Sequence, residues 1–167
     1  MPIPKLTMDT NLLLEYWKQQ DKREHVERLL GLAKMGKVDL AVTARIHEDI
    51  PDNPQAEWLN ELPVLDVNET ASVMRLGHGI LGRDMLGDEA FAAFEATGCA
   101  LAKQRGRHSP DWRDWDHLHA HYLLQRDVFL TWDEGIICLS DDLATRFGII
   151  VMRPEEYLQT IEVSGVR

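Results

Sequence analysis

Four acidic residues that are far apart in the sequence could together perform metal-dependent chemistry: Asp9, Glu48, Asp116 and Asp133. Like charges about 4 Å apart repel by several kcal/mol at a surface-like dielectric, so a cluster of carboxylates must be partly protonated or hold a cation. Mg²⁺ and Mn²⁺ prefer carboxylate and water ligands. A cation held in this way can neutralise a phosphodiester and lower the pKa of a bound water. The four acids therefore predict metal-dependent phosphodiester hydrolysis.

Each of the four acids also has a simpler explanation, as a helix cap or a solvated helix residue. Two of them have acidic neighbours that are alternatives: Asp49 for Glu48, and Asp111 or Asp114 for Asp116. The order and spacing of the four acids, rather than any one of them, favour a shared site.

The elements that must position these acids follow from hydrophobic periodicity and turn residues. Strands are predicted at 5–9, 38–43, 62–67, 127–131 and 149–152. Helices are predicted at 11–17, 21–37, 44–50, 68–81, 88–103, 116–126 and 139–147, with a last helix from Pro154. Short apolar strands that alternate with helices indicate a parallel sheet covered on both faces. The active site of such a sheet lies beyond the carboxyl ends of its strands, where Asp9 and Asp133 fall.

Length and composition indicate one soluble domain that spans residues 1–167. No apolar run approaches the roughly 20 residues that span a bilayer, and the N-terminus lacks the features of a secretory signal. We therefore expect a cytoplasmic protein without a membrane partner. Cys99 and Cys138 lie far apart in sequence and are expected to be reduced thiols.

The net charge of −10 counts against a broad nucleic-acid-binding surface, because such surfaces neutralise phosphates. A polyanionic substrate would need bound cations or a local basic patch. The stretch AKQRGRHSPDWR offers such a patch, and its basic residues include Lys103, Arg105, Arg107 and Arg113. Two tryptophans, Trp112 within the stretch and Trp115 just after it, are available for base stacking. The alternative is a solvated loop whose tryptophans pack into the core.

Two further features have competing interpretations. The HLHAH run invites a zinc site, but the helical pattern around it leaves only His117 and His121 on a common face. We therefore expect histidines on a helix surface beside the acids. The apolar face of Phe91, Phe94 and Leu101 is either core or a homodimer surface.

Several stretches resemble the PIN-domain family: MDTNLLLEYW, VTARIHEDI, and DHLHAHYLLQRDVFLTWDEGI followed by FGIIVMRPEEYL. The acidic positions of the family fall on Asp9, Glu48, Asp116 and the Thr131-Trp132-Asp133 motif. Asp116 lies 17 residues before Asp133, close to the family spacing. The middle of the chain, roughly 51–113, does not align by eye and is longer than in compact members.

The resemblance implies a PIN-like three-layer α/β/α fold with a central, mainly parallel sheet and an enlarged helical middle segment. It implies an Mg²⁺- or Mn²⁺-dependent endoribonuclease with Asp9, Glu48 and Asp116 as the main metal-binding acids and Asp133 in support. Thr131 would orient a carboxylate or water. Asn11 would steady the loop after Asp9 or contact substrate.

The resemblance also indicates which partners to expect besides RNA. Many bacterial members are toxins of the VapC type that a small antitoxin neutralises. An alternative function is a catalytically weak PIN-like domain that binds or scaffolds through a protein partner. A haloacid-dehalogenase-like phosphatase fits less well, because Asn11 stands where the second acid of its Asp-x-Asp motif belongs.

Overall fold

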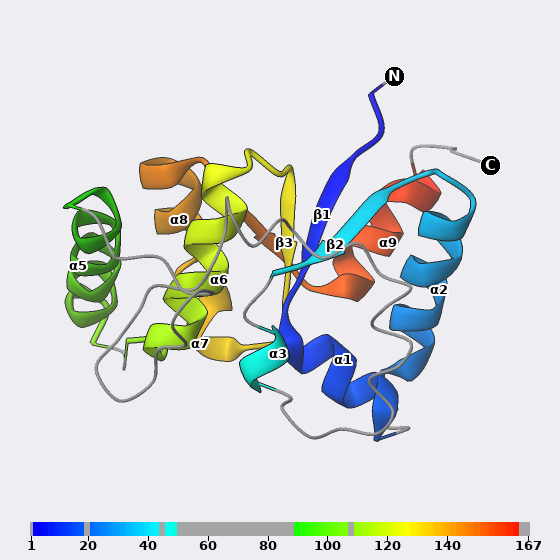
Figure 1. Ribbon diagram of the computed structural model, residues 1–167, viewed down its shortest axis with the longest axis horizontal. Coiled ribbons are helices and arrows are strands. Elements are labelled where there is room, and N and C mark those ends of the chain that lie inside the picture. The colour runs from blue at the N-terminus through cyan, green and yellow to red at the C-terminus, as the bar shows by residue number, and fades with distance from the viewer. Residues whose placement is uncertain (1, 19–20, 44–45, 50–88, 107–108, 164–167) are drawn as a thin grey trace.

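Among the described residues, four parallel strands form one sheet at the centre of the molecule (Figure 1). The computed structural model describes residues 2–18, 21–43, 46–49, 89–106 and 109–163, with the backbone alone for residues 47 and 48. The strands are β1 (Lys5–Met8), β2 (Asp39–Val42), β3 (Val128–Leu130) and β4 (Ile150–Met152), in the order β2-β1-β3-β4. The predicted α/β class with a parallel sheet is confirmed. The predicted strand 62–67 and helix 68–81 lie outside the described residues.

Helices connect the strands and cover both faces of the sheet (Figure 1). Their bounds are α1 Thr10–Trp17, α2 Arg23–Lys34, α3 Ile46–Asp49, α5 Glu89–Gln104, α6 Trp112–Leu123, α7 Glu134–Ile137, α8 Ser140–Phe147 and α9 Pro154–Val163. Two predictions differ from this arrangement. Helix α6 begins four residues before the predicted start at 116, and α7 precedes the helix predicted at 139–147.

Alternating side chains along the strands supply two separate cores, as expected for a strand buried on both faces. On β3, Val128 and Leu130 pack with α1, α2 and α9, whereas Phe129 packs on the opposite face with α6 and α8. On β1, Leu6 and Met8 belong to the first core. The three-layer arrangement follows from this alternation.

Helix α5 packs against α6 on the second face. Phe91, Phe94 and Leu101 are at most 8% exposed, and the Phe94 ring meets the Trp115 ring edge-on at a centroid distance of 6.0 Å. These apolar residues therefore belong to the core, which removes them as a homodimer surface. Cys99 and Cys138 are free, half-buried thiols at the edge of the same core. Within the described ranges, no helix is long and apolar enough to cross a membrane.

The carboxyl ends of the strands lead directly into the elements that carry the predicted acids. Parallel pairing aligns Met8 with Val42 on one side and with Leu130 on the other. The chain then enters α1 after β1, α3 after β2 and α7 after β3, and these helices lie together at one end of the sheet (Figure 1). Any polar group at these junctions is therefore held close to the others.

Candidate functional site

A pocket of about 270 Å³ opens at this end of the sheet, between the strand ends and the first turn of α6. We call it the acid pocket, because five aspartates line it: Asp9, Asp49, Asp111, Asp114 and Asp133. Two of the four predicted acids, Asp9 and Asp133, are among them. The pocket lining also includes Asp49, Asp111 and Asp114, which the sequence offered as alternatives to Glu48 and Asp116.

Asp9 is fixed by side chains from its own loop and from the end of β3. It stands at the N-cap position of α1, but its side chain makes no capping hydrogen bond. Instead, its Oδ2 accepts hydrogen bonds from Thr131 Oγ1 at 2.6 Å and from Asn11 Nδ2 at 2.7 Å. Thr131 is fully buried, and its Oγ1 also accepts the backbone N–H of Asp133 at 2.9 Å. The loops after β1 and β3 are thus joined at Asp9.

Asp133 combines a structural role with a place in the acid pocket. Its Oδ1 accepts the backbone N–H of Ile136 at 3.0 Å, which caps the short helix α7. Its carboxylate nevertheless lines the pocket beside Asp9. The helix-cap explanation and the site prediction therefore both apply to this residue.

Asp49 reaches the acid pocket from α3, whereas the side chain of Glu48 lies outside the described residues. The Oδ2 atom of Asp49 accepts a hydrogen bond from Thr10 Oγ1 and is 2.9 Å from His117 Nε2. The other ring nitrogen of His117, Nδ1, is hydrogen-bonded to Thr43. His117 is 2% exposed and lines the pocket, so the structure adds a buried histidine to the predicted acids.

Asp114, and not Asp116, faces the acid pocket from α6. The helix begins at Trp112, because Asp111 caps it and exchanges reciprocal hydrogen bonds with Asp114 in a capping box. Asp116 therefore lies one turn inside the helix rather than at its start, and it is buried with 5% of its surface exposed. The predicted N-terminal placement of Asp116 was wrong. The D-x-x-D spacing after Pro110 is the sequence signal that identifies the true start.

Burial and neighbouring acids raise the pKa of two aspartates in the pocket, Asp9 and Asp114. Burial raises the pKa of Asp9 above its ordinary value, and the charge of Asp133 adds to this, although His117 and Thr131 oppose it. Burial and the charges of Asp9 and Asp133 raise the pKa of Asp114 to about 7. Burial lowers the pKa of His117, but its hydrogen bond to the Asp49 carboxylate and the charge of Asp9 outweigh this effect and leave the pKa raised. The pocket therefore holds more negative charge than its own residues neutralise.

The raised pKa of Asp114 predicts a pH-dependent stability difference between the protein and Asp114→Asn. The folded protein binds a proton more tightly than the unfolded chain between pH 3.8 and about 7, so its stability falls as pH rises through this window. Asparagine removes this loss and still accepts the N–H of Asp111. In EDTA at pH 7.5, we expect Asp114→Asn to have a higher melting temperature and a free energy of unfolding larger by at most ~4 kcal/mol, at 1.36 kcal/mol per pKa unit.

The measurement is the melting temperature of both proteins from pH 4 to pH 8. The advantage of Asp114→Asn should shrink towards pH 4, close to the pKa of 3.8 in the unfolded chain, where the raised pKa of the folded state costs little stability. Asp141→Asn, an exposed change in α8, is the control and should show no such trend. A difference between Asp114→Asn and wild type that stays constant with pH would contradict the prediction.

The predicted basic patch is only partly at the acid pocket. Arg113 lines the pocket. Lys103 is exposed at the end of α5, Arg105 is paired with Asp142 at 2.9 Å, and Arg107 lies outside the described residues. Of the two tryptophans, Trp115 is 1% exposed and packs into the core.

Two histidines of the HLHAH run do not lie on the helix surface, and the third, His119, is half-buried. His117 and His121 are buried against the sheet, because they share the face by which α6 covers it. His119 meets the Phe91 ring edge-on at 4.8 Å. In the part of the chain that the structure describes, no three His, Cys, Asp or Glu side chains form a group that could hold a metal ion as they stand.

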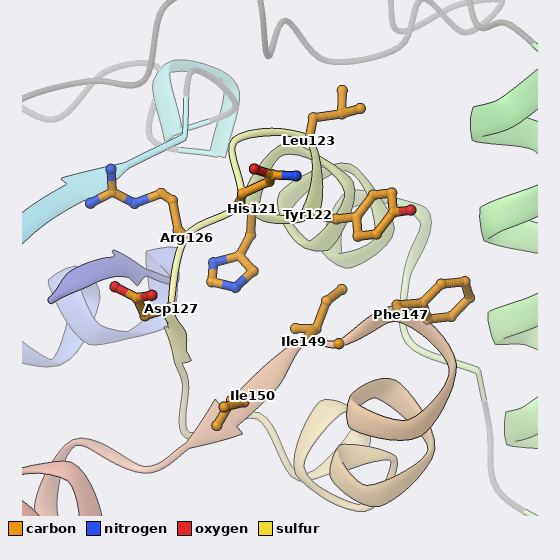
Figure 2. A pocket seen from close by; sticks show the side chains of 10 residues that line it. His121, Tyr122, Leu123, Arg126, Asp127, Phe147, Ile149 and Ile150 are labelled. Atoms are coloured by element: carbon orange, nitrogen blue, oxygen red, sulfur yellow. The ribbon is translucent and has the colours of Figure 1, made fainter.

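A larger hollow of about 550 Å³ lies at the opposite end of the sheet, where the chain enters β3 and β4. Figure 2 shows Tyr122 and Phe147 on one side of it and Arg126 and Asp127 on the other. The Asp127 carboxylate accepts the backbone N–H of Lys5 at 2.7 Å. Burial and the charge of Arg126 lower the pKa of His121, in the same lining, to about 4. Asp127 is already hydrogen-bonded and the pKa of His121 is lowered, so this lining does not suit phosphodiester hydrolysis. The smaller acid pocket is therefore the candidate site.

The sequence matches no protein-family model and no curated protein. Among solved structures, the chain is similar to a chain in the crystal structure of VapBC2 from Rickettsia felis bound to a DNA fragment from its promoter. The identity is 12% and the TM-score 0.46, over 89% of this chain and 98% of that chain. A similarity at this level does not indicate what this chain does.

Proposed function

We propose that this chain is an Mg²⁺- or Mn²⁺-dependent nuclease that hydrolyses RNA phosphodiester bonds, as its resemblance to PIN-domain ribonucleases implies. One observation carries the proposal. Four chain segments bring Asp9, Asp49, Asp114 and Asp133 into a single pocket of about 270 Å³ at the carboxyl ends of the strands.

The residues of the acid pocket fit a hard divalent cation. All the carboxylate oxygens are suitable donors, and burial together with neighbouring acids raises the pKa of Asp9 and Asp114, which a bound cation would offset. Mg²⁺ is usually bound through one or two carboxylates with waters and substrate phosphates, so a three-residue protein group is not required. We propose Asp9 and Asp114 as the principal ligands, supported by Asp133 and by an acid of α3, either Asp49 or Glu48.

Each part of the pocket then has a chemical task. The bound cation would supply charge neutralisation at the phosphodiester and a water of lowered pKa. Thr131 and Asn11 hold the Asp9 carboxylate in one orientation through their hydrogen bonds to Oδ2. His117 holds Asp49 against the pocket wall and offsets part of its negative charge.

The proposal is tested by the metal dependence of RNA cleavage. The purified protein should cut an unstructured RNA oligonucleotide in Mg²⁺ or Mn²⁺, and EDTA should stop cleavage until excess cation is restored. Cleavage that continues unchanged in EDTA, or no cleavage of any RNA with either cation, would overturn it.

Thermal stability provides a second measurement that does not depend on turnover. At pH 7.5, Mn²⁺ should raise the melting temperature of the wild-type protein, because ligands that bind only the folded state stabilise it. The increase should be smaller in Asp114→Asn, which has lost a proposed ligand and the repulsion that the cation relieves.

A second candidate function is a catalytically weak domain that binds or scaffolds through a protein partner. It is favoured by one observation, the lack of a three-residue ligand group among the described side chains. Calorimetric titration separates the two: binding of Mn²⁺ at micromolar to low millimolar concentration supports the nuclease, and no binding at millimolar concentration supports the scaffold.

An antitoxin partner follows from the family resemblance alone. We propose that a small antitoxin binds this chain, which predicts a short reading frame directly upstream of the gene. Its product should co-purify with this chain and inhibit RNA cleavage.

A further inference from the structure

Arg113 stands among the aspartates of the acid pocket without pairing with any of them. It is exposed in the first turn of α6 and lines the pocket. Within the described residues, its guanidinium makes no hydrogen bond or ion pair with a carboxylate; its carbon Cζ lies 5.3 Å from the ring centroid of Trp112. This is unexpected for a cation beside so many anions.

The capping box explains why the nearest carboxylates do not bind Arg113. Asp111 Oδ1 accepts the backbone N–H of Arg113 itself at 3.3 Å. Asp114 Oδ2 accepts the backbone N–H of Asp111 at 2.7 Å. Both carboxylates are therefore directed at the helix end, and the guanidinium projects beside them.

Most other arginines in the described ranges are paired with acids, which makes Arg113 distinctive. The pairs are Arg23–Glu27, Arg28–Glu162, Arg105–Asp142, Arg126–Asp39 and Arg153–Glu134. A guanidinium that is already paired must exchange a carboxylate for a phosphate before it can bind a substrate. Among the residues that the structure describes, Arg113 has no carboxylate partner to give up.

We propose that Arg113 is a substrate-binding residue whose guanidinium binds a nucleic-acid phosphate next to the one that enters the acid pocket. This inference rests on the proposed nuclease function and names the contact that lets a protein of net charge −10 hold a polyanion. A planar guanidinium can bind phosphate oxygens through two parallel hydrogen bonds. Its position at the pocket rim places this contact on the strand beside the scissile group.

The first test is the kinetics of cleavage of an RNA of about 12 nucleotides by Arg113→Gln, Arg113→Lys and wild type. Because the contact is made before and during the reaction, Arg113→Gln should raise KM by about 10-fold with kcat changed less than about 3-fold. Arg113→Lys should recover part of the loss, since lysine keeps the charge but not the fork. Arg146→Gln is the control: Arg146 is likewise exposed, in α8, and lies outside the pocket lining, so KM should be unchanged.

Salt dependence tests whether the contact is a phosphate. Loss of one contact should reduce the slope of log KM against log salt concentration by about 0.7 between roughly 50 and 200 mM KCl. Arg146→Gln should leave the slope unchanged. Equal effects of Arg113→Gln and Arg146→Gln, or a fall in kcat at constant KM, would overturn the proposal.

Binding without cleavage separates this inference from the proposed function. Fluorescence anisotropy with the same RNA in EDTA should show about 10-fold weaker binding by Arg113→Gln than by wild type, and no change for Arg146→Gln. If wild type cleaves nothing but this difference is found, the nuclease proposal fails and Arg113 remains a phosphate contact. If RNA is cleaved but Arg113→Gln binds and cleaves like wild type, only the inference about Arg113 fails.

Discussion

Replacement of Asp9 by asparagine is expected to reduce metal-dependent RNA cleavage at least ~100-fold, or about 2.7 kcal/mol at 1.36 kcal/mol per tenfold change. Asparagine has nearly the size of aspartate but carries no charge, so it would be a poor ligand for a hard cation. Asp9 is the acid that both neighbouring loops hold in place, through Thr131 and Asn11. Its loss should therefore affect the chemistry more than loss of any other acid in the pocket.

The same substitution should leave the fold intact, which allows the activity to be interpreted. The asparagine carbonyl can still accept the hydrogen bonds from Thr131 and Asn11. Burial raises the pKa of Asp9, so removing its charge relieves a cost of folding at neutral pH. The melting temperature at pH 7.5 in EDTA should equal or exceed that of wild type.

Asp141→Asn is the matched control, because it makes the same chemical change at an exposed position in α8. Its cleavage rate should stay within about 2-fold of wild type. Wild type and the two variants are compared by their initial rates of RNA cleavage at saturating Mn²⁺. Equal rates for wild type and Asp9→Asn would refute the catalytic role of the acid pocket.

The largest stability effect is expected from Gly98→Ala, at the contact between α5 and α6. A Cβ atom on Gly98 would lie 2.2 Å from Trp115 Cη2 and 2.4 Å from Cζ3. Trp115 is 1% exposed, and its Nε1 donates a hydrogen bond to Ser109 Oγ at 3.2 Å, so the ring has little room to move. Overpacking of this kind typically costs 1–3 kcal/mol.

The expected net loss for Gly98→Ala is about 2 kcal/mol, even though alanine is the better helix former by up to about 1 kcal/mol. For a chain of this size that corresponds to a fall in melting temperature of about 4–8 °C. Thermal unfolding followed by circular dichroism measures it. The substitution should also disturb the acid pocket, because α6 carries Asp114 and His117.

Gly31→Ala, in α2, isolates the helix propensity from the packing effect. Within the described part of the chain, no atom outside its own helix lies within 4 Å of a Cβ placed there, so this variant should be stabilised by up to about 1 kcal/mol. The two Gly→Ala changes are thus expected to have opposite signs. Equal stability of Gly98→Ala and Gly31→Ala would contradict the prediction that a Cβ at Gly98 clashes with Trp115. The double variant Gly98→Ala with Trp115→Leu should lose less than the two single changes added together, because the smaller side chain removes the clash.

The sequence by itself determined the alternation of strands and helices and the strand ends at which Asp9 and Asp133 lie. Both results depend on local information: the period of apolar residues along a strand, and the residue that follows it. Because all the strands of the described sheet are parallel, their carboxyl ends meet at one edge. The approach of Asp9 to Asp133 also needs β1 and β3 to be neighbours, and this pairing came from the structure.

Only the tertiary structure decided that Asp114, rather than Asp116, faces the pocket. Successive residues of an α-helix are rotated by about 100°, so Asp114 and Asp116 point about 160° apart, whereas Asp114 and His117 are only about 60° apart. The helix start at Trp112 and the packing of α6 on the sheet select the face that carries Asp114 and His117. The rotation of α3 likewise places Asp49 beside His117. Periodicity identifies a helix, but the face that meets the site depends on contacts made by residues distant in sequence.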